Sequence, residues 1–399
     1  MTAIPVGDAI ALTHALVAID SRNPSLVAGA PGERECAERL VEVLRSWQVD
    51  AWLQPVEGRR ANVVARAGPV GVAPLVFNGH LDVVGTEAMT HPPFVPVERD
   101  GRLYGRGSCD MKGGVAAMCA AVARAVQRGS LAREVWITAV VDEEWMSSGT
   151  AALLAAWQRP EAGMSTPTRW PVGAIITEPT ALAICPAHKG FEWLRIELTG
   201  RAAHGSRHDL GVDAIVHAGL VLASLEQLER EELPRRTHPL LGRASVHAAE
   251  IQGGTGLSTY PDRCVLTIER RTLPGETARE VRDELQGRLD RIASVRPTFR
   301  ADVTSLGGQP PSDVDVSAPI VRALAAALDS EHHPIAIAGM SAWTDAALFN
   351  AAGIPAICFG PGDIALAHAA TEWVPTDDIE RATRTLERLL TSPDSIKLS

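Results

Sequence analysis

Three short apolar runs in this chain each lead directly into histidine or acidic residues. The runs and the polar residues that follow them are Leu75 to Phe77 before His80, Val135 to Val141 before Asp142-Glu143-Glu144, and Ala174 to Ile176 before Glu178. Continuous apolar runs of this length are typical of strands buried on both faces of a parallel sheet. Ligands of such sheets gather at the carboxyl ends of the strands. We therefore expect these polar residues to meet at one edge of a mostly parallel sheet.

Helix and strand patterns alternate along much of the chain, which is typical of an α/β fold. A glycine-rich loop at 105–114 precedes a helix of small residues. We expect helices on both faces of the mostly parallel sheet. Helices are predicted at 8–20, 33–47, 115–128, 320–328 and 376–390, and strands at 62–67, 75–78, 135–141 and 354–359.

The pattern changes between residues 184 and 304. Strands are predicted there at 192–198, 244–251, 264–269 and 298–303, and helices at 212–232 and 277–292. This β-α-β-β-α-β order is that of a ferredoxin-like unit. At 399 residues the chain exceeds the usual size of a single hydrophobic core. We therefore predict a discontinuous larger domain, 1–183 with 305–399, into which 184–304 is inserted.

The composition argues against several classes of partner. A formal net charge of −10 without a basic cluster disfavours nucleic acid and anionic membranes, so the substrate should be small. No apolar run approaches the roughly 20 residues that cross a bilayer. The N-terminus lacks the pattern of a secretory signal, which favours a cytoplasmic protein. The six cysteines show no C-x-x-C spacing, and most of them are expected to be reduced and buried.

A histidine and an aspartate stand two residues apart in His80-Leu81-Asp82. On an extended segment both side chains point to the same face, so the Asp82 carboxylate can accept one imidazole N–H while the other nitrogen binds a metal. Asp110 lies in the glycine-rich loop, whose backbone can wrap closely around a buried centre. A phosphate-binding loop is the alternative, but Lys112 is followed by Gly113 rather than by Ser or Thr. A carboxylate that bridges two metals is therefore favoured for Asp110.

Two adjacent carboxylates end the second apolar run. One of Glu143 and Glu144 can bind metal while the other stays free as a proton shuttle, and the alternative is a solvated acidic pair on the surface. Glu178 ends the third run in the same manner, and His368 lies in a small-residue loop near the C-terminus. With the histidine and aspartate described above, these residues supply ligands for two divalent metals and a free carboxylate base. The set predicts a metallohydrolase.

These motifs resemble those of the M20-type dinuclear zinc peptidases and deacylases, a family that includes acetylornithine deacetylase, succinyl-diaminopimelate desuccinylase and glutamate-releasing carboxypeptidases. The resemblance extends from the segment at 20–24 to the last helix. It implies two Zn²⁺ ions, for which Co²⁺ or Mn²⁺ can substitute. The implied ligand sets are His80, Asp110 and Glu178 for one zinc, and Asp110, Glu144 and His368 for the other.

The resemblance also implies roles for residues outside the two ligand sets. Asp82 would orient His80, and Glu143 would be the general base. A cis peptide bond would follow Asp110. In the inserted segment, His204 would reach the active site of a partner subunit and stabilise the oxyanion, which predicts a homodimer formed through a lid domain.

A further set of residues is implied to bind substrate. Arg271 resembles the family arginine that holds the substrate carboxylate, although Arg270 stands beside it, and residues 339–345, including Thr344, would line the pocket. Ser258 stands where the family commonly has an asparagine that contacts substrate. Trp343 indicates either an apolar or aromatic pocket or a buried structural tryptophan. Glu178 in place of aspartate is similar to the carboxypeptidase and deacylase members.

The sequence thus predicts a hydrolase that uses two zinc ions to cleave the amide bond of an N-acyl amino acid or a short peptide. A metallocarboxypeptidase or dipeptidase of the same family is the alternative among enzymes. The alternative outside enzymes is a metal-stabilised binding protein without turnover. The free carboxylate of Glu143 argues against that alternative, because a structural metal site needs no base.

Overall fold

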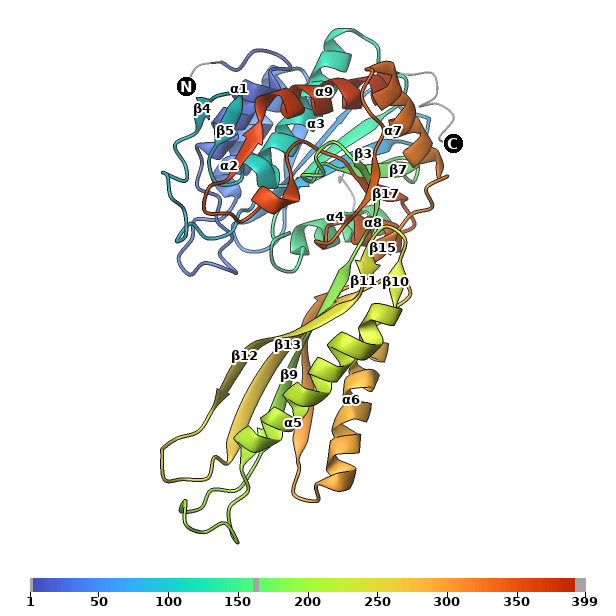
Figure 1. Ribbon diagram of the computed structural model, residues 1–399. Coiled ribbons are helices and arrows are strands. Elements are labelled where there is room, and N and C mark those ends of the chain that lie inside the picture. The colour runs from blue at the N-terminus through green and yellow to red at the C-terminus, as the bar shows by residue number, and fades with distance from the viewer. Residues whose placement is uncertain (1–2, 161–164, 392–399) are drawn as a thin grey trace. The chain divides into compact units, whose positions relative to one another are not determined.

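The computed structural model describes residues 3–160 and 165–391 (Figure 1). The chain divides into two compact units. Unit 1 comprises Met1–Pro186, Val314–Ala338 and Thr344–Ser399, and unit 2 comprises Ala187–Asp313 and Gly339–Trp343. Within the described ranges, every helix is too short or too polar to span a bilayer.

The centre of unit 1 is a β-sheet whose strands follow the order β1-β2-β6-β3-β7-β17-β8. The four central strands, β6, β3, β7 and β17, run parallel to one another, which confirms the predicted mostly parallel centre. Outside them, β1, β2 and β8 pair antiparallel, which the sequence did not predict. The strand bounds are β1 (Asp50–Pro55), β2 (Ala61–Ala67), β3 (Leu75–His80), β6 (Val135–Val140), β7 (Gly173–Ile176), β8 (Ile184–His188) and β17 (Ala356–Cys358).

Helices cover both faces of this sheet (Figure 1). Ile137 of β6 packs in one core with residues of α1 (Ala9–Val17), α2 (Arg34–Ser46), α3 (Gly113–Gln127), α7 (Pro319–Ser330) and α9 (Thr376–Thr391). Its neighbour Trp136 meets the ring of Trp157, from α4 (Ser148–Gln158), edge-on at 5.6 Å. Because successive side chains of a strand point to opposite faces, α4 lies on the other face of the sheet.

The remaining elements of unit 1 are short. A small antiparallel sheet has the strand order β18-β5-β4, and α8 (Ala346–Ala351) contacts β17. The six cysteines are buried free thiols, as predicted. The bounds of the short elements of unit 1 are β4 (Val97–Arg99), β5 (Arg102–Tyr104), β18 (Trp373–Pro375), a π-type turn at Ser108–Lys112 and a 3₁₀ turn at Ile364–Leu366. Strand β16 (Ile337–Met340) begins in unit 1 and ends in unit 2, and β15 (Ser312–Asp313) belongs to unit 2.

Unit 2 is built on an antiparallel sheet in the order β12-β13-β9-β14. Along the chain its main elements are β9 (Gly190–Thr199), α5 (Ala214–Gln227), β12 (Ser245–Gly253), β13 (Arg263–Thr272), α6 (Ala278–Val295) and β14 (Ala301–Gln309). This is the β-α-β-β-α-β order that the sequence predicts. The unit also contains turns at Leu228–Glu232 and Leu233–Arg235 and the short strands β10 (Thr237–His238) and β11 (Gly242–Arg243).

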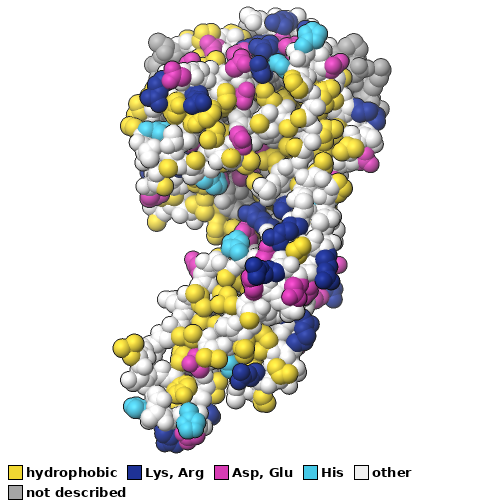
Figure 2. Space-filling model, in the orientation of Figure 1, with side chains coloured by type: hydrophobic (Ala, Val, Ile, Leu, Met, Phe, Trp, Pro, Cys, Tyr) yellow, Lys and Arg dark blue, Asp and Glu magenta, His cyan; other side chains and the backbone are white. Residues whose placement is uncertain are grey.

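The two long helices of unit 2 begin where side chains cap them. The Asp213 carboxylate accepts a hydrogen bond from the backbone N–H of Val216 at 2.9 Å, so α5 begins at Ala214 and not at the predicted residue 212. Thr277 and Glu280 form a reciprocal capping box at the start of α6. Apolar residues of both helices pack on one face of the sheet. Acidic and basic side chains are interspersed on the face of this unit seen in Figure 2.

Candidate metal centre

The polar residues that follow the apolar runs do meet at one edge of the sheet. Strand β3 lies between β6 and β7 and is parallel to both. His80 is the last residue of β3, Glu143 and Glu144 follow β6, and Glu178 follows β7. Because the three strands are adjacent and point the same way, their carboxyl ends bring these side chains together. The prediction made from the apolar runs is confirmed.

The first predicted ligand set is brought together and buried. Nε2 of His80 lies 3.0 Å from Oδ1 of Asp110 and 3.9 Å from Oε1 of Glu178. One donor atom from each of the three residues lies within 4.8 Å of the other two. This spacing allows one nitrogen and two carboxylate oxygens to surround a single cation.

The second predicted ligand set shares Asp110 with the first. Nε2 of His368 lies 3.4 Å from Oδ2 of Asp110 and 3.0 Å from Oε2 of Glu144. The donor atoms of these three residues again lie within 4.8 Å of one another. Asp110 therefore directs one oxygen toward each histidine, which is the arrangement a bridging carboxylate needs. The His368 side chain is 54% exposed, so this second set is the more open one.

The loop that presents Asp110 depends on glycine. Gly107 has a φ of 80°, in the left-handed region, where the chain enters the π-type turn at Ser108–Lys112. A Cβ atom on Gly114 would lie 1.9 Å from the carbonyl oxygen of Thr177. Only glycine therefore lets the start of α3 approach the end of β7, beside Glu178. The peptide bond between Asp110 and Met111 is cis, as the resemblance implied.

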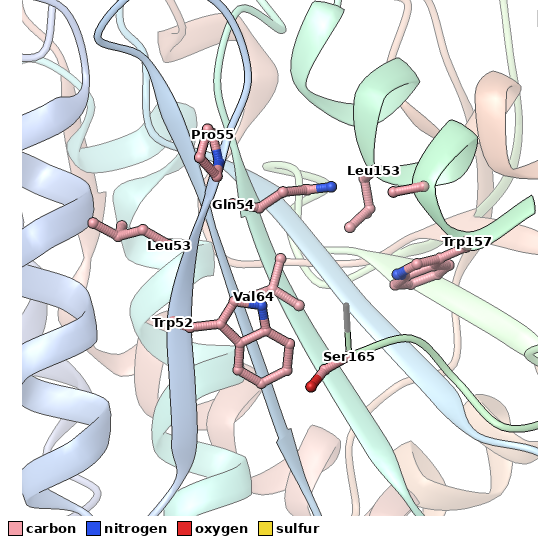
Figure 3. A pocket seen from close by; sticks show the side chains of 9 residues that line it. Trp52, Leu53, Gln54, Pro55, Val64, Leu153, Trp157 and Ser165 are labelled. Carbon is pink, nitrogen blue, oxygen red and sulfur yellow. The ribbon is translucent and has the colours of Figure 1, made fainter. Parts of the chain in front are cut away.

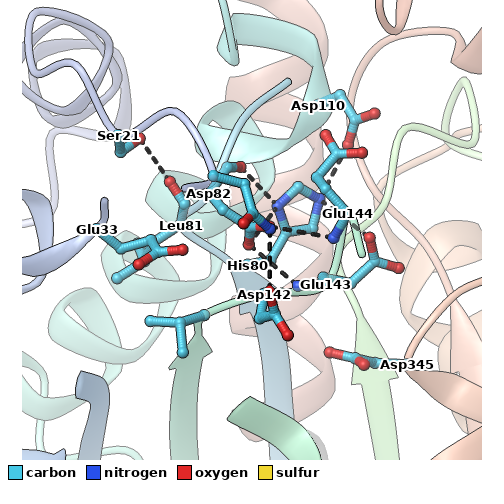
Figure 4. A network of polar contacts seen from close by, with 12 residues as sticks. Ser21, Glu33, His80, Leu81, Asp82, Asp110, Asp142, Glu143, Glu144 and Asp345 are labelled. Carbon is cyan, nitrogen blue, oxygen red and sulfur yellow. Dashed lines mark hydrogen bonds and ion pairs between the residues drawn. The ribbon is translucent and has the colours of Figure 1, made fainter. Parts of the chain in front are cut away.

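The Asp82 side chain has partners besides His80, the residue it is expected to orient. Nδ1 of His80 donates to the backbone oxygen of Asp82 at 2.9 Å, while the Asp82 carboxylate lies 3.6 Å from that nitrogen. The carboxylate also accepts hydrogen bonds from the backbone N–H groups of Glu143 at 3.2 Å and of Glu144 at 3.1 Å. The side-chain amide of Asn23 donates to it at 2.8 Å. Asp82 thus holds the backbone that presents both glutamates (Figure 4).

A buried polar network lies behind this contact (Figure 4). Asp142 accepts hydrogen bonds from Arg60 at 2.8 Å, from Asn23 at 3.2 Å and from the hydroxyl of Ser148 at 2.8 Å. Arg60 also forms an ion pair with Glu33, which is fully buried. Asn23 and Asp142 belong to segments that the sequence singled out, but their contacts come from tertiary structure. The network joins the N-terminal segment to the loop that contains Glu143 and Glu144.

The two ligand sets and Glu143 together contain more acidic groups than histidines. This excess of carboxylates raises the pKa values of several groups among them. Burial raises the pKa of Glu143 and of Glu178 well above the usual carboxyl value, and neighbouring carboxylates raise each further. Hydrogen bonds to Asp110 and Glu144 raise the pKa of His368 to about 11. Burial opposes a charged His80, yet the hydrogen bond to Asp110 raises its pKa as well. Positive charge at this place, whether on a histidine or on a cation, is therefore favourable.

Asp345 is a further buried acid near the cluster, in the range that the resemblance places along the substrate pocket. It accepts a hydrogen bond from the hydroxyl of Thr150 at 2.7 Å, and burial raises its pKa to about 6. Its charge contributes to the raised pKa of Glu143. Its neighbour Thr344 is 1% exposed, with Oγ1 3.2 Å from the sulfur of Cys358. The role of Thr344 in binding substrate stays a prediction.

The other predicted functional residues belong to unit 2. His204 is exposed, and its Nδ1 lies 2.8 Å from the hydroxyl of Ser206. The backbone N–H of Gly205 donates to the carbonyl oxygen of Ser258 at 2.7 Å, so the segments of His204 and Ser258 lie side by side. Both residues therefore occupy one pair of neighbouring loops in this unit.

The structure distinguishes the two adjacent arginines. Arg270 is 1% exposed and forms an ion pair with Glu276, so its guanidinium is engaged inside unit 2. Arg271 is partly exposed, pairs with Glu269 at 3.0 Å and lies over the ring of Phe191, 5.6 Å from its centroid. Arg271 is thus the more accessible of the two.

Trp343 belongs to an aromatic cluster of unit 2. Its ring is edge-on to Phe191 at 6.3 Å and to His188 at 6.2 Å. Its indole N–H donates to the carbonyl oxygen of Pro310 at 3.0 Å. Arg271 therefore lies beside apolar ring surface, because Phe191 contacts both it and Trp343.

A pocket of about 310 Å³ lies elsewhere in unit 1 (Figure 3). It is lined by side chains of β1, β2 and α4, among them Trp52, Gln54 and Trp157. None of its lining residues belongs to either ligand set, so this pocket is separate from the predicted chemistry.

The sequence matches Peptidase family M20/M25/M40 over residues 76–392. The chain belongs to this family. Its sequence is 31% identical to the acetylornithine deacetylase of Myxococcus xanthus over 335 residues, which covers 82% of this chain and 83% of that one. The matched range contains both ligand sets, whereas Asn23 and Arg60 of the buried network precede it.

Solved structures of M20 proteins have the same fold. An M20 family metallo-carboxypeptidase from Sulfolobus solfataricus superposes with a TM-score of 0.80 at 17% identity, covering 96% of this chain and 98% of that chain. A dinuclear metal-binding M20 peptidase from Bacillus subtilis superposes with a TM-score of 0.70 at 17% identity, covering 96% of each chain. This M20 protein is therefore a hydrolase of known fold, as the motifs predicted.

Proposed function

We propose that this M20 protein hydrolyses the amide bond of N-acyl amino acids at a centre of two divalent cations, with zinc as the first expectation. The observation that supports the proposal most directly is the position of Asp110, whose two oxygens face two histidines from different parts of the chain. The name of the Myxococcus relative supports a deacylase, and the dinuclear metal-binding peptidase from Bacillus supports two metals.

The donor atoms fit such cations. Each set offers one imidazole nitrogen and two carboxylates, a combination that suits Zn²⁺ and, with its oxygen ligands, Mn²⁺ or Co²⁺. The raised pKa values of Glu143 and Glu178 mean that added positive charge would stabilise the cluster. Two divalent cations held by these ligand sets would polarise a carbonyl oxygen and make water a better nucleophile at neutral pH.

Glu143 is proposed as the general base. It belongs to neither ligand set, yet its carboxylate lies 4.0 Å from Nε2 of His80. The contact of Asp82 with its backbone N–H holds it in place. Glu143 accepts a proton from the attacking water and delivers it to the leaving nitrogen, a task that a positioned carboxylate outside the ligand sets can perform.

The substrate side of the proposal concerns unit 2, which we take to be the predicted insert of 184–304. Arg271 is proposed to bind the free carboxylate of the substrate, since its planar guanidinium suits two parallel hydrogen bonds. The aromatic rings beside it favour substrates with an apolar group near that carboxylate. His204 is proposed to stabilise the oxyanion at the active site of a partner subunit. Ser258, and Thr344 of unit 1, are proposed as further substrate contacts.

The experiment combines a metal assay with amine release from a substrate panel. The panel contains N-acetylornithine, N-succinyl-diaminopimelate, N-acetylphenylalanine and unmodified dipeptides. We expect two cations per chain, amine release from at least one N-acyl amino acid, and loss of both after treatment with a chelator. Release from dipeptides alone would assign the protein to the peptidases instead. Turnover that persists after complete metal removal would contradict the proposal.

A homodimer through unit 2 is also proposed. Strand β12 lies at the edge of its sheet, and its residues from His247 to Gly253 are exposed. Ile251 on this strand is 54% exposed, Val216 on α5 is 54% exposed and Leu257 is fully exposed. An open strand edge with apolar neighbours favours pairing with a second chain. Sedimentation equilibrium should therefore give twice the chain mass of 42.4 kDa.

A further inference from the structure

The carboxylate of Glu372 is completely buried beneath the loop that presents Asp110. Glu372 follows His368 by four residues and immediately precedes β18, and its exposed fraction is 0%. It is not a member of either ligand set. A buried carboxylate is unfavourable unless hydrogen bonds or opposite charge compensate for the loss of water.

Four donors converge on the two oxygens of Glu372. Oε1 accepts the backbone N–H of Cys109 at 3.0 Å and that of Asp110 at 3.1 Å. Oε2 accepts the backbone N–H of Gly107 at 3.1 Å and the guanidinium of Arg106 at 2.8 Å. The side chain thus binds three backbone N–H groups of one short loop, and one of these donors is the N–H of the shared ligand itself.

Arg106 ties the same loop to two other segments. Its guanidinium donates to the carbonyl oxygen of Gly85 at 3.1 Å, in the segment that follows His80 and Asp82. It also lies 3.5 Å from the carbonyl oxygen of Ala369, next to His368. The positive charge of Arg106 compensates the buried negative charge of Glu372. Without this partner the buried carboxylate would strongly destabilise the fold.

We infer that Glu372 is a positioning residue of the metal centre, which fixes Asp110 between His80 and His368. The inference rests on the proposed function, since it assigns a purpose to the position of a proposed ligand. A movement of the loop backbone would displace both Asp110 oxygens together, so both cation sites would be affected. The ion pair with Arg106 alone could stabilise the fold, whereas the hydrogen bond from the Asp110 N–H connects Glu372 directly to the proposed ligand.

The substitution Glu372→Gln isolates this role. Glutamine keeps the volume of the side chain but turns one of the two acceptor oxygens into an NH₂ group. That group would face either the N–H groups of Cys109 and Asp110 or the N–H of Gly107 and the Arg106 guanidinium, so donors would meet donors. Mutation of a residue that hydrogen-bonds to a metal ligand typically lowers the metal affinity by about 10- to 100-fold. We expect E372Q to bind Zn²⁺ weaker by that factor.

The control is Glu380→Gln. Glu380 lies on α9 and pairs with Arg124 at 3.1 Å, so this variant also removes one acid from an arginine pair, but away from the Asp110 loop. The readout is Zn²⁺ affinity and stoichiometry, measured on the purified full-length chain by competition with a chromophoric chelator. The wild type and E380Q should agree within about twofold, and circular dichroism should show that each variant is folded.

The outcomes separate the inference from the proposed function. Weakened Zn²⁺ binding in folded E372Q, with E380Q unchanged, supports the positioning role. If E372Q is not recovered folded, the same titration on Glu372→Asp decides, because aspartate keeps the charge but is one methylene too short to reach all the donors. A folded variant at Glu372 that binds two Zn²⁺ ions with wild-type affinity would overturn the inference alone. A wild type that binds no pair of cations would overturn the proposed function.

Discussion

The substitution Asp82→Asn tests the most specific geometric claim about the site. Asp82 is 0% exposed, and its two oxygens accept three hydrogen bonds: Glu143 N–H on one, and Glu144 N–H with the Asn23 amide on the other. Asparagine has one acceptor oxygen. Whichever way its amide turns, an NH₂ group faces at least one backbone N–H.

The magnitude follows from that mismatch. Leaving a buried donor unsatisfied costs about 1–3 kcal/mol. Because the donor belongs to the peptide of Glu143 or Glu144, the cost applies to the conformation that presents these glutamates. At 1.4 kcal/mol per factor of ten, the expected loss in kcat is about 5- to 150-fold. The KM should change little, since Asp82 has no proposed contact with substrate.

The assay is steady-state hydrolysis of the best N-acyl substrate by zinc-saturated enzyme. Asp20→Asn is the matched control, because Asp20 lies in the same N-terminal region as Asn23 and pairs with Arg22 at 2.8 Å near the surface. That variant should keep wild-type kcat. If folded D82N also kept kcat within twofold of wild type, the claim that Asp82 holds the two glutamates would be refuted.

Two further predictions concern Glu143 and His188. In Glu143→Ala, zinc stoichiometry should stay at the wild-type value while kcat falls by about 10²- to 10⁴-fold, the usual contribution of general acid–base catalysis; wild-type kcat in that variant would remove Glu143 as the base. Burial lowers the pKa of His188 from 6.5 to about 4, so the unfolded chain binds a proton there that the folded chain does not. The neutral ring therefore contributes its full share to the free energy of unfolding above about pH 6.5, and that share is lost as the pH falls toward 4. At pH 5 the free energy of unfolding should be lower by about 2 kcal/mol on this account. Urea unfolding at pH 5 and pH 8 should therefore show a smaller decline for His188→Phe, and an equal decline would contradict the assignment.

Much of the fold could be predicted because its strongest patterns are local. The apolar runs that become β3, β6 and β7 are continuous because these strands are buried on both faces. Elements without such a pattern were missed. Helix α4 is rich in alanine and has no polar face, and β1 is an outer strand of six residues with mixed burial.

The sequence predicted the candidate metal ligands but not the residues that hold those ligands in position. His80, Glu144 and Glu178 follow apolar runs, so the sequence itself places them at the carboxyl ends of neighbouring strands. Glu372 and its partner Arg106 are separated by 266 positions, and nothing in the residues between them indicates that they meet.

The sequence by itself determined which side chains are available for chemistry and which strands bring them to one edge. Both properties depend on residue type and on the pattern of apolar residues within short segments of the chain. Tertiary structure alone decided which atoms meet: that Asp82 binds the backbone of Glu143 and Glu144, and that Glu372 binds the N–H of Asp110. Hydrogen bonds are short and directional, so partners far apart in sequence are determined only when the whole chain has packed.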